Sequence, residues 1–174
     1  MPRFEWYEVT QSREIEQGDI LENVDIYIPL PHQEGQEEPV PSRLETHDVI
    51  ILTQSCDIIK PECQHLVGCP VWTLEDAKQE IAHFRTGKGC EDLRKGWVVG
   101  YHLLDRCDKP NFRRDFRVVN FYRVFELPKS RVMAIVATQS ERLRLLPPFR
   151  EHMSQSFARF FMRVGLPVDI PAFV

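Results

Sequence analysis

A set of polar side chains comes directly after a run of four apolar residues in the segment Asp48–Asp57. The run Val49–Leu52 predicts a strand that is buried on both faces. Hydroxyl, amide, thiol and carboxylate groups then follow, carried by Thr53, Gln54, Ser55, Cys56 and Asp57. Polar groups at the end of a buried strand lie at the rim of a core, where binding or chemistry is usually done. The same residue types also cap turns, so the sequence leaves a binding groove and a structural corner both open.

The cysteines near this segment raise two further possibilities. A zinc site would use Cys56, Cys63, His65 and Cys69, but their spacing contains no paired C-x2-C motif, and we predict no metal. A nucleophilic Cys56 would need a histidine nearby, such as His47, His65 or His102. We favour a small buried thiol instead, with Cys56 pointing to the core and Asp57 accepting hydrogen bonds from the backbone or an arginine. The segment 87–89 lacks the rest of a Walker motif, so no nucleotide cofactor is expected.

Charge is distributed unevenly along the 174 residues. Residues 1–87 carry 6 Lys/Arg and 17 Asp/Glu, whereas residues 88–174 carry 16 and 9, which gives −11 and +7 and a net charge of −4. Either a basic surface meets an acidic partner such as a nucleic acid, or the two halves neutralise each other in the fold. No apolar run approaches the roughly 20 residues that span a bilayer. Five cysteines do not suggest a disulfide framework, so we expect a reduced, cytoplasmic protein without a membrane segment.

The hydrophobic pattern predicts mainly strands and two helical regions. Strands are expected at Gln17–Ile28, Val49–Leu52, His65–Trp72, Trp97–Leu104 and Phe116–Leu127, and short strand or turn pieces at Arg131–Thr138 and Arg142–Leu146. The segment Pro29–Pro41 is typical of a mobile polar loop. A helical insertion is expected over about 74–95, after a Thr73 cap. An amphipathic helix is expected over 148–165, with an apolar face made of Phe149, Met153, Phe157, Phe160, Phe161 and Val164.

These elements in this order resemble the MazF/PemK/Kid family. The likeness lies in the Gly18-Asp19-Ile20-Leu21 opening, the long polar loop, the strand ending at Thr53 and Ser55, the Cys69-Pro70-Val71-Trp72-Thr73 strand and the C-terminal helix. The resemblance implies an α+β fold in which residues 1–174 form one SH3-like antiparallel β-barrel, which we expect to have five to seven strands. It also implies a homodimer as a possible state. The best-known members are toxins of toxin–antitoxin pairs that cut single-stranded RNA without a metal or cofactor.

The resemblance also suggests catalytic residues. The family has an arginine, usually followed by proline, before its second strand, and a threonine or serine at the end of its third strand. Arg43 and Thr73 are the nearest matches, although no proline follows Arg43. His47, next to the strand, is a candidate general base because imidazoles titrate near neutral pH.

The resemblance implies two candidate functions. The first is a metal-independent endoribonuclease of toxin–antitoxin or phage-defence type, with single-stranded RNA in a groove between Pro29–His47 and the strand ends at Thr53–Asp57 and Thr73. The second is a non-catalytic module of the same fold that binds a protein partner, either an antitoxin-like segment or a regulatory factor. A hydrolase built on Cys56 is a third, weaker possibility.

Overall fold

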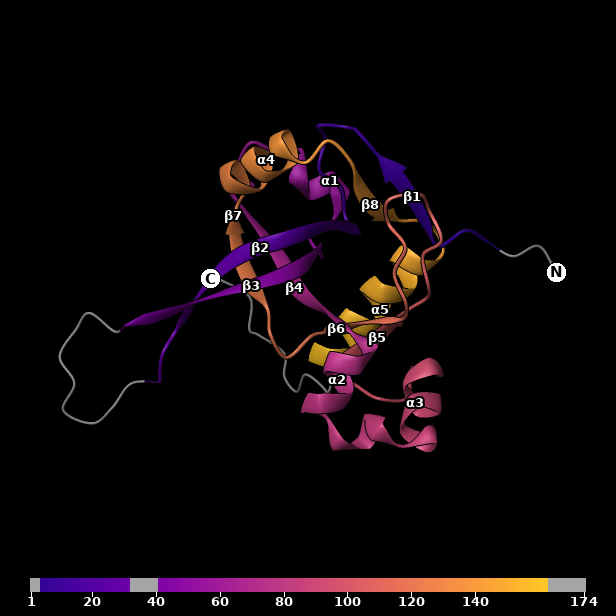
Figure 1. The fold of residues 1–174 in the computed structure, drawn as a ribbon. Coiled ribbons are helices and arrows are strands. Elements are labelled where there is room, and N and C mark those ends of the chain that lie inside the picture. The colour runs from indigo at the N-terminus through magenta and orange to yellow at the C-terminus, as the bar shows by residue number, and fades with distance from the viewer. Residues whose placement is uncertain (1–3, 32–40, 163–174) are drawn as a thin grey trace, which may run out of the picture.

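An eight-stranded antiparallel sheet organises the protein (Figure 1). The computed structural model describes residues 4–31 and 41–162. The strands are β1 (Tyr7–Thr10), β2 (Asp19–Pro29), β3 (Ser42–Ile51), β4 (His65–Thr73), β5 (Tyr101–Leu104), β6 (Arg117–Asn120), β7 (Phe125–Pro128) and β8 (Arg142–Leu145). The helices are α1 (Ser55–Ile58), α2 (Leu74–Glu80), the 3-10 turn η1 (Ala82–Arg85), α3 (Gly87–Arg94), α4 (Lys129–Thr138) and α5 (Phe149–Phe161).

The strands follow the order β1-β8-β2-β3-β4-β6-β5, and β7 pairs with β4 off this path. β4 is the branch point of the sheet. One of its edges pairs with β3, while the other pairs first with β7, from His65 to Gly68, and then with β6, from Val71 to Thr73. The two end strands, β1 and β5, do not pair with each other in the described part of the chain, so the sheet is open.

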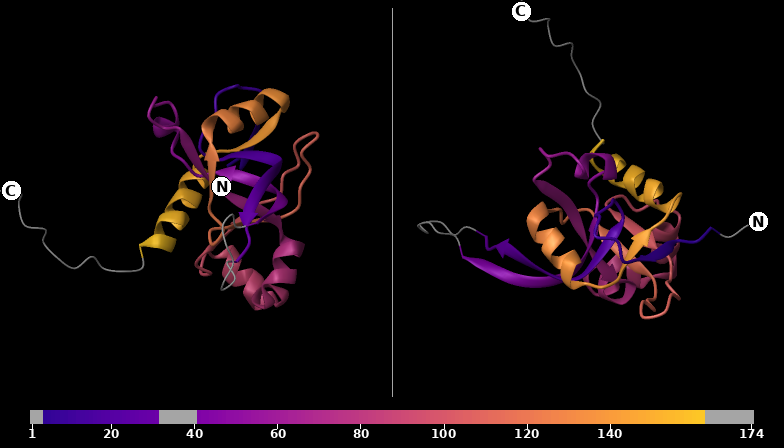
Figure 2. Two further views of the ribbon diagram at one scale, coloured as in Figure 1. Left: turned by 90° about the vertical axis from the view of Figure 1, so that its left-hand side faces the viewer. Right: turned by 90° about the horizontal axis from the view of Figure 1, so that it is seen from above.

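Helices cover both faces of the sheet. Alternate residues of β3 point to opposite faces, and they divide the core accordingly. Ile50 belongs to the core cluster that contains Met153 of α5. Val49 and Ile51 belong to the cluster on the other face, which contains Val132 and Val136 of α4. A third, smaller cluster lies beneath α2, η1 and α3, against Val118 of β6. Figure 2 shows α4 and α5 on different sides of the strands.

A buried ion-pair network joins the start of β2 to β8. Asp19 is fully buried and accepts from Arg142 Nε at 2.9 Å and from Arg144 Nε at 2.6 Å. The same arginines donate to the backbone carbonyls of Ser12 and Glu14. Buried charges are tolerated when they are paired and fully hydrogen-bonded. This network therefore fixes the irregular loop between β1 and β2 against the sheet.

The outer halves of β2 and β3 form a two-stranded arm whose far end projects from the body of the protein (Figures 1 and 2). At its base Val24 and Ile26 remain buried in the core cluster that contains Val132. The paired segments run from Val24 to Pro29 and from Ser42 to His47. Their outer edges have no strand partner among the described residues, because β8 pairs with β2 only at Asp19 and Ile20 and β4 pairs with β3 only from Asp48 onward.

The predicted α+β class and antiparallel pairing are confirmed, and so are the helical region after Thr73 and the amphipathic helix from Phe149. The predicted closed barrel is not confirmed, because the sheet is open and has eight strands. The predicted strand Phe116–Leu127 is two strands, β6 and β7, and β1 was missed. Most of Pro29–Pro41 and the end of the 148–165 helix lie outside the described residues.

The segment Arg131–Thr138 was predicted wrongly as a strand or turn, because it belongs to helix α4. Its apolar, β-branched run favours a strand by composition. The two residues that it buries, Val132 and Val136, are four apart. That spacing places two side chains on one face of a helix and equally on one face of a strand.

None of the helices in the described ranges combines the length and the apolar character needed to cross a membrane.

The α5 face supplies a stability prediction. Met153 is the buried residue of α5, whereas Phe157 is only half-buried and Phe161 is 61% exposed. We expect Met153→Ala to lower the free energy of unfolding by about 2–5 kcal/mol, because it removes buried methylene groups and leaves a cavity. Phe161→Ala is the matched control and should change it by about 0.5 kcal/mol or less. Urea denaturation measures both, and equal effects would contradict the observed packing of α5.

Candidate functional site

Glu45 lies at the centre of a cluster of donors at the base of the arm. Its carboxylate accepts from Arg123 Nη2 at 2.7 Å, from Arg43 Nε at 3.0 Å and from a second Arg43 nitrogen, and it lies 2.8 Å from His47 Nε2. Arg43, Glu45 and His47 share one face of β3 because side chains alternate along a strand. Hydrogen bonds from Arg123, Arg43 and His47 lower the pKa of Glu45 to about 2, so the carboxylate is ionised at neutral pH.

A cavity of about 620 Å³ opens beside this cluster. We call it the Glu45 pocket, and its lining residues are Arg43, Glu45, His47, Trp72, Asp76, Gln79, Glu80 and Arg123. Its volume falls within the range of pockets that hold small ligands. The cationic side chains come from β3 and from the segment before β7, whereas Asp76, Gln79 and Glu80 come from α2. The pocket therefore has a basic wall and an acidic wall, and Trp72 of β4 also lines it.

The His47 ring is held between Glu45 and Phe125. Nε2 contacts the Glu45 carboxylate, so Nδ1 is the ring nitrogen that Glu45 does not use. The ring stacks on Phe125 with centroids 5.8 Å apart. A carboxylate that orients one nitrogen of an imidazole fixes the tautomer and supports the other nitrogen as a base. The pair Glu45–His47 can therefore take part in acid–base chemistry, with two guanidinium groups beside it.

Thr73 lies next to the pocket but does not line it. Its hydroxyl oxygen accepts from the Asp76 backbone N–H at 3.0 Å, and the hydroxyl donates to Asp76 Oδ2 at 2.6 Å. These contacts make Thr73 the N-cap of α2, as its position before the predicted helix indicated. Thr73 acts here by placing Asp76, and it contacts neither Arg43 nor His47.

The segment Thr53–Asp57 lies at the other end of β3, and none of its residues lines the Glu45 pocket. The structure thus joins Arg43 and His47 but does not bring them into one groove with the strand ends at Thr53–Asp57. The polar groups of this segment bond locally: Thr53 accepts from Val67 N–H, and Ser55 accepts from Gln17 N–H. Gln54 is the N-cap residue of α1 and makes no side-chain cap bond.

Two expectations about this corner were wrong in detail. Cys56 is exposed and does not point to the core. Asp57 pairs with Lys60, at 2.6 Å, and not with an arginine. The short helix α1 explains both, because it turns the chain outward directly after Thr53 and places residues 56 and 57 on its solvent side.

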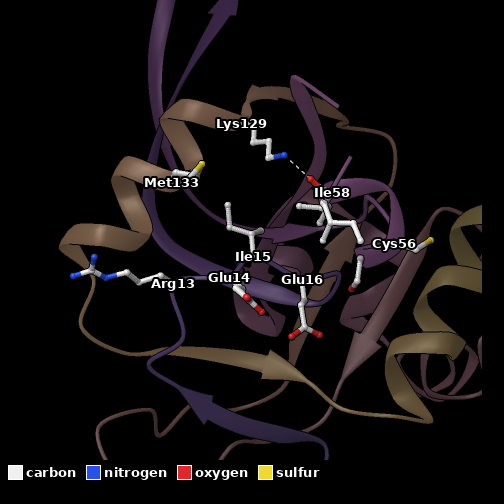
Figure 3. A pocket seen from close by; sticks show the side chains of 10 residues that line it. Arg13, Glu14, Ile15, Glu16, Cys56, Ile58, Lys129 and Met133 are labelled. Atoms are coloured by element: carbon white, nitrogen blue, oxygen red, sulfur yellow. Dashed lines mark hydrogen bonds between the residues drawn. The ribbon is translucent and has the colours of Figure 1, made fainter. Parts of the chain in front are cut away.

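A second cavity, of about 590 Å³, lies beside this corner (Figure 3). Ile15, Ile58 and Met133 surround it, and Lys129 Nζ donates to the Ile58 carbonyl at 2.5 Å. Figure 3 shows the sulfur of Cys56 at one side of the cavity, turned away from its centre. Among the described residues no group of three or more His, Cys, Asp or Glu side chains is arranged to hold a metal ion.

Sequence reasoning missed Glu45 and Arg123. Glu45 had a detectable signal, because it lies midway between two selected residues, Arg43 and His47, and shares their face of β3. Arg123 had none, since 78 residues separate it from Glu45 along the chain. Comparisons with protein-family models, with curated proteins and with solved structures found no match.

The Glu45 cluster predicts an acid-sensitive contribution to stability. Because the pKa of Glu45 is lower in the folded protein than its usual value of 4.5, the stabilisation is complete above about pH 4.5. It is lost as the pH falls toward about 2. As the pH falls through this interval, the difference in the free energy of unfolding between the wild type and Glu45→Gln should therefore shrink toward zero. Glu62→Gln, at an exposed residue with no ion pair among the described ones, is the control. A constant difference between wild type and Glu45→Gln from pH 5 to pH 2 would refute the assignment.

The exposure of Cys56 is tested by thiol labelling. Cys56 should react rapidly with an aromatic disulfide, whereas Cys69 and Cys107 are buried and burial raises the pKa of Cys69 to about 12. Cys56→Ser should remove the fast phase, and Cys63→Ser, at a half-buried thiol, should retain it. Survival of the fast phase in Cys56→Ser would show that another thiol is the accessible one.

Proposed function

We propose that the Glu45 pocket binds single-stranded RNA and cleaves it without a metal ion. One observation carries the proposal: a single carboxylate holds two guanidinium groups and an imidazole at one 620 Å³ cavity. Cleavage of RNA needs a base for the ribose 2′-hydroxyl and cations for the charge that develops on the phosphate. The resemblance to MazF/PemK-like nucleases belongs to this proposal, and it supports the same reaction class.

The chemistry assigned to each side chain is as follows. His47 takes the proton of the 2′-hydroxyl, and the 2′-oxygen attacks the adjacent phosphorus. The bond from phosphorus to the 5′-oxygen breaks, and that oxygen takes up a proton from solvent water. The products are a 2′,3′-cyclic phosphate and a free 5′-hydroxyl. Arg43 and Arg123 stabilise the phosphorane, because each guanidinium has five N–H donors and Glu45 uses only part of them.

A second candidate function is binding of a protein partner along the arm. The residues from Val24 to Pro29 and from Ser42 to His47 have outer edges without a strand partner in the described ranges. Tyr27 and Leu44, which pair directly across the arm, are both exposed. Unpaired edges next to exposed apolar side chains favour addition of a strand from another chain. The partner would be an extended regulatory or antitoxin-like segment that pairs with a strand edge and places apolar side chains beside Tyr27 and Leu44.

Incubation of the purified protein with mixed single-stranded RNA in EDTA tests the nuclease proposal. We expect cleavage to persist in the chelator and to leave 2′,3′-cyclic phosphate ends. Arg43→Ala, His47→Ala and Arg123→Ala should each lower the rate, by about 100-fold or more where the group acts in the transition state. The logarithm of affinity should fall with the logarithm of salt concentration by roughly 0.7 per phosphate contacted.

Arg94→Ala is the matched control, because Arg94 pairs with Glu91 on α3 and does not line the pocket. It should leave the rate unchanged. Absence of both cleavage and salt-dependent RNA binding would remove the nuclease proposal and favour the protein-binding alternative.

A further inference from the structure

The acidic wall of the Glu45 pocket has no role in the cleavage step. It consists of Asp76 and Glu80, one helical turn apart on α2, with Gln79 beside them. The Asp76 carboxylate already accepts from the Thr73 hydroxyl, and the Asp76 backbone N–H donates to the same hydroxyl, which N-caps α2. Glu80 makes no hydrogen bond or ion pair with any residue that the structure describes. A carboxylate that lines a cavity without a partner is an acceptor available to a ligand.

The two walls restrict the chemistry of that ligand. Arg43 and Arg123 favour an anion on one side, whereas Glu80 accepts only hydrogen-bond donors on the other. Trp72 lines the same cavity and is only partly buried, so it offers part of its ring to a planar group. Unpaired bases in protein sites are commonly stacked on aromatic rings and hydrogen-bonded along their Watson–Crick edges. A nucleotide meets all three demands at once.

The four RNA bases differ in what they present to a carboxylate. Guanine offers two adjacent donors on its Watson–Crick edge, the N1–H and the N2 amino group, which match the two oxygens of one carboxylate. Adenine and cytosine place a ring-nitrogen acceptor next to their amino group, and uracil places its N3–H between two carbonyls. Each of these three sets an acceptor against the carboxylate, which leaves lone pairs facing each other and lowers affinity.

We propose that the Glu45 pocket selects guanine, with Glu80 accepting from guanine N1–H and N2–H, Trp72 stacking on the base, and Arg43 and Arg123 holding the phosphate. This inference rests on the proposed RNA function and adds the base that the site recognises. Glu80 is the specificity residue and Trp72 binds any base by stacking, and neither contacts the reacting atoms.

Calorimetric binding of 5′-mononucleotides tests the inference separately from cleavage. GMP should bind about 10-fold or more tightly than AMP, CMP or UMP. IMP, which lacks the N2 amino group, should lose most of that advantage. Glu80→Gln should weaken GMP binding to the level of AMP and leave AMP binding unchanged. Trp72→Leu should weaken all four nucleotides by about 10-fold, because stacking does not depend on the base.

The matched control is Glu75→Gln, since Glu75 is an exposed residue of the same helix that pairs with Lys78 and does not line the pocket. It should preserve the GMP preference. Equal affinity for all four nucleotides would overturn the guanine assignment and leave the nuclease proposal intact. No binding of any nucleotide, together with no RNA cleavage, would overturn both. Tighter binding of an arginine-containing peptide than of GMP would also overturn the inference and would assign the acidic wall to a protein partner.

Discussion

The buried pairing of Asp19 with Arg142 and Arg144 is the constraint on which the arrangement of the sheet depends. β8 lies between β1 and β2 in the sheet although more than 120 residues separate Asp19 from either arginine along the chain. A buried carboxylate without these partners would be an uncompensated charge, and removal of one partner from a buried pair is strongly destabilising. The pairing therefore couples the start of β2 to β8, and it anchors the loop that forms one side of the cavity in Figure 3.

Glu45 is likewise a carboxylate that accepts from two arginines, but its arginines keep donors that the protein does not use. All three guanidinium nitrogens of Arg142 donate to protein acceptors, so that arginine has little capacity for a ligand. Arg43 donates to Glu45 through two of its three guanidinium nitrogens, and Arg123 donates to it through one. Each of these two guanidinium groups therefore keeps N–H donors that Glu45 does not use. The number of donors left unused distinguishes an arginine that holds the fold together from one that can hold a phosphate.

Local pattern predicted most elements but not how they are assembled. β2, β4 and α5 were predictable because alternation and helical spacing are properties of neighbouring residues. The openness of the sheet was not, because closure depends on which distant strands meet. α4 was misjudged because Val132 and Val136 fit a helix and a strand equally well. At the site, Arg43 and His47 were expected in the loop before Val49, whereas β3 begins at Ser42 and carries both on one face. Arg123 reaches Glu45 only through the tertiary fold.

The arm has a consequence for the dynamics of the pocket. Beyond Ile26, which is buried in the core, the ribbon has neither a third strand nor a buried residue in its described part. Such segments open locally far more often than the body of a protein unfolds. Arg43 lies on this outer part, whereas Trp72 and the residues of α2 are attached to the main sheet. The pocket thus lies between a segment whose backbone amides we expect to exchange readily with solvent and a segment whose amides are protected by the main sheet. Amide hydrogens on its two sides should exchange with solvent by different mechanisms, and an occupant that bridges them would slow exchange in the ribbon first.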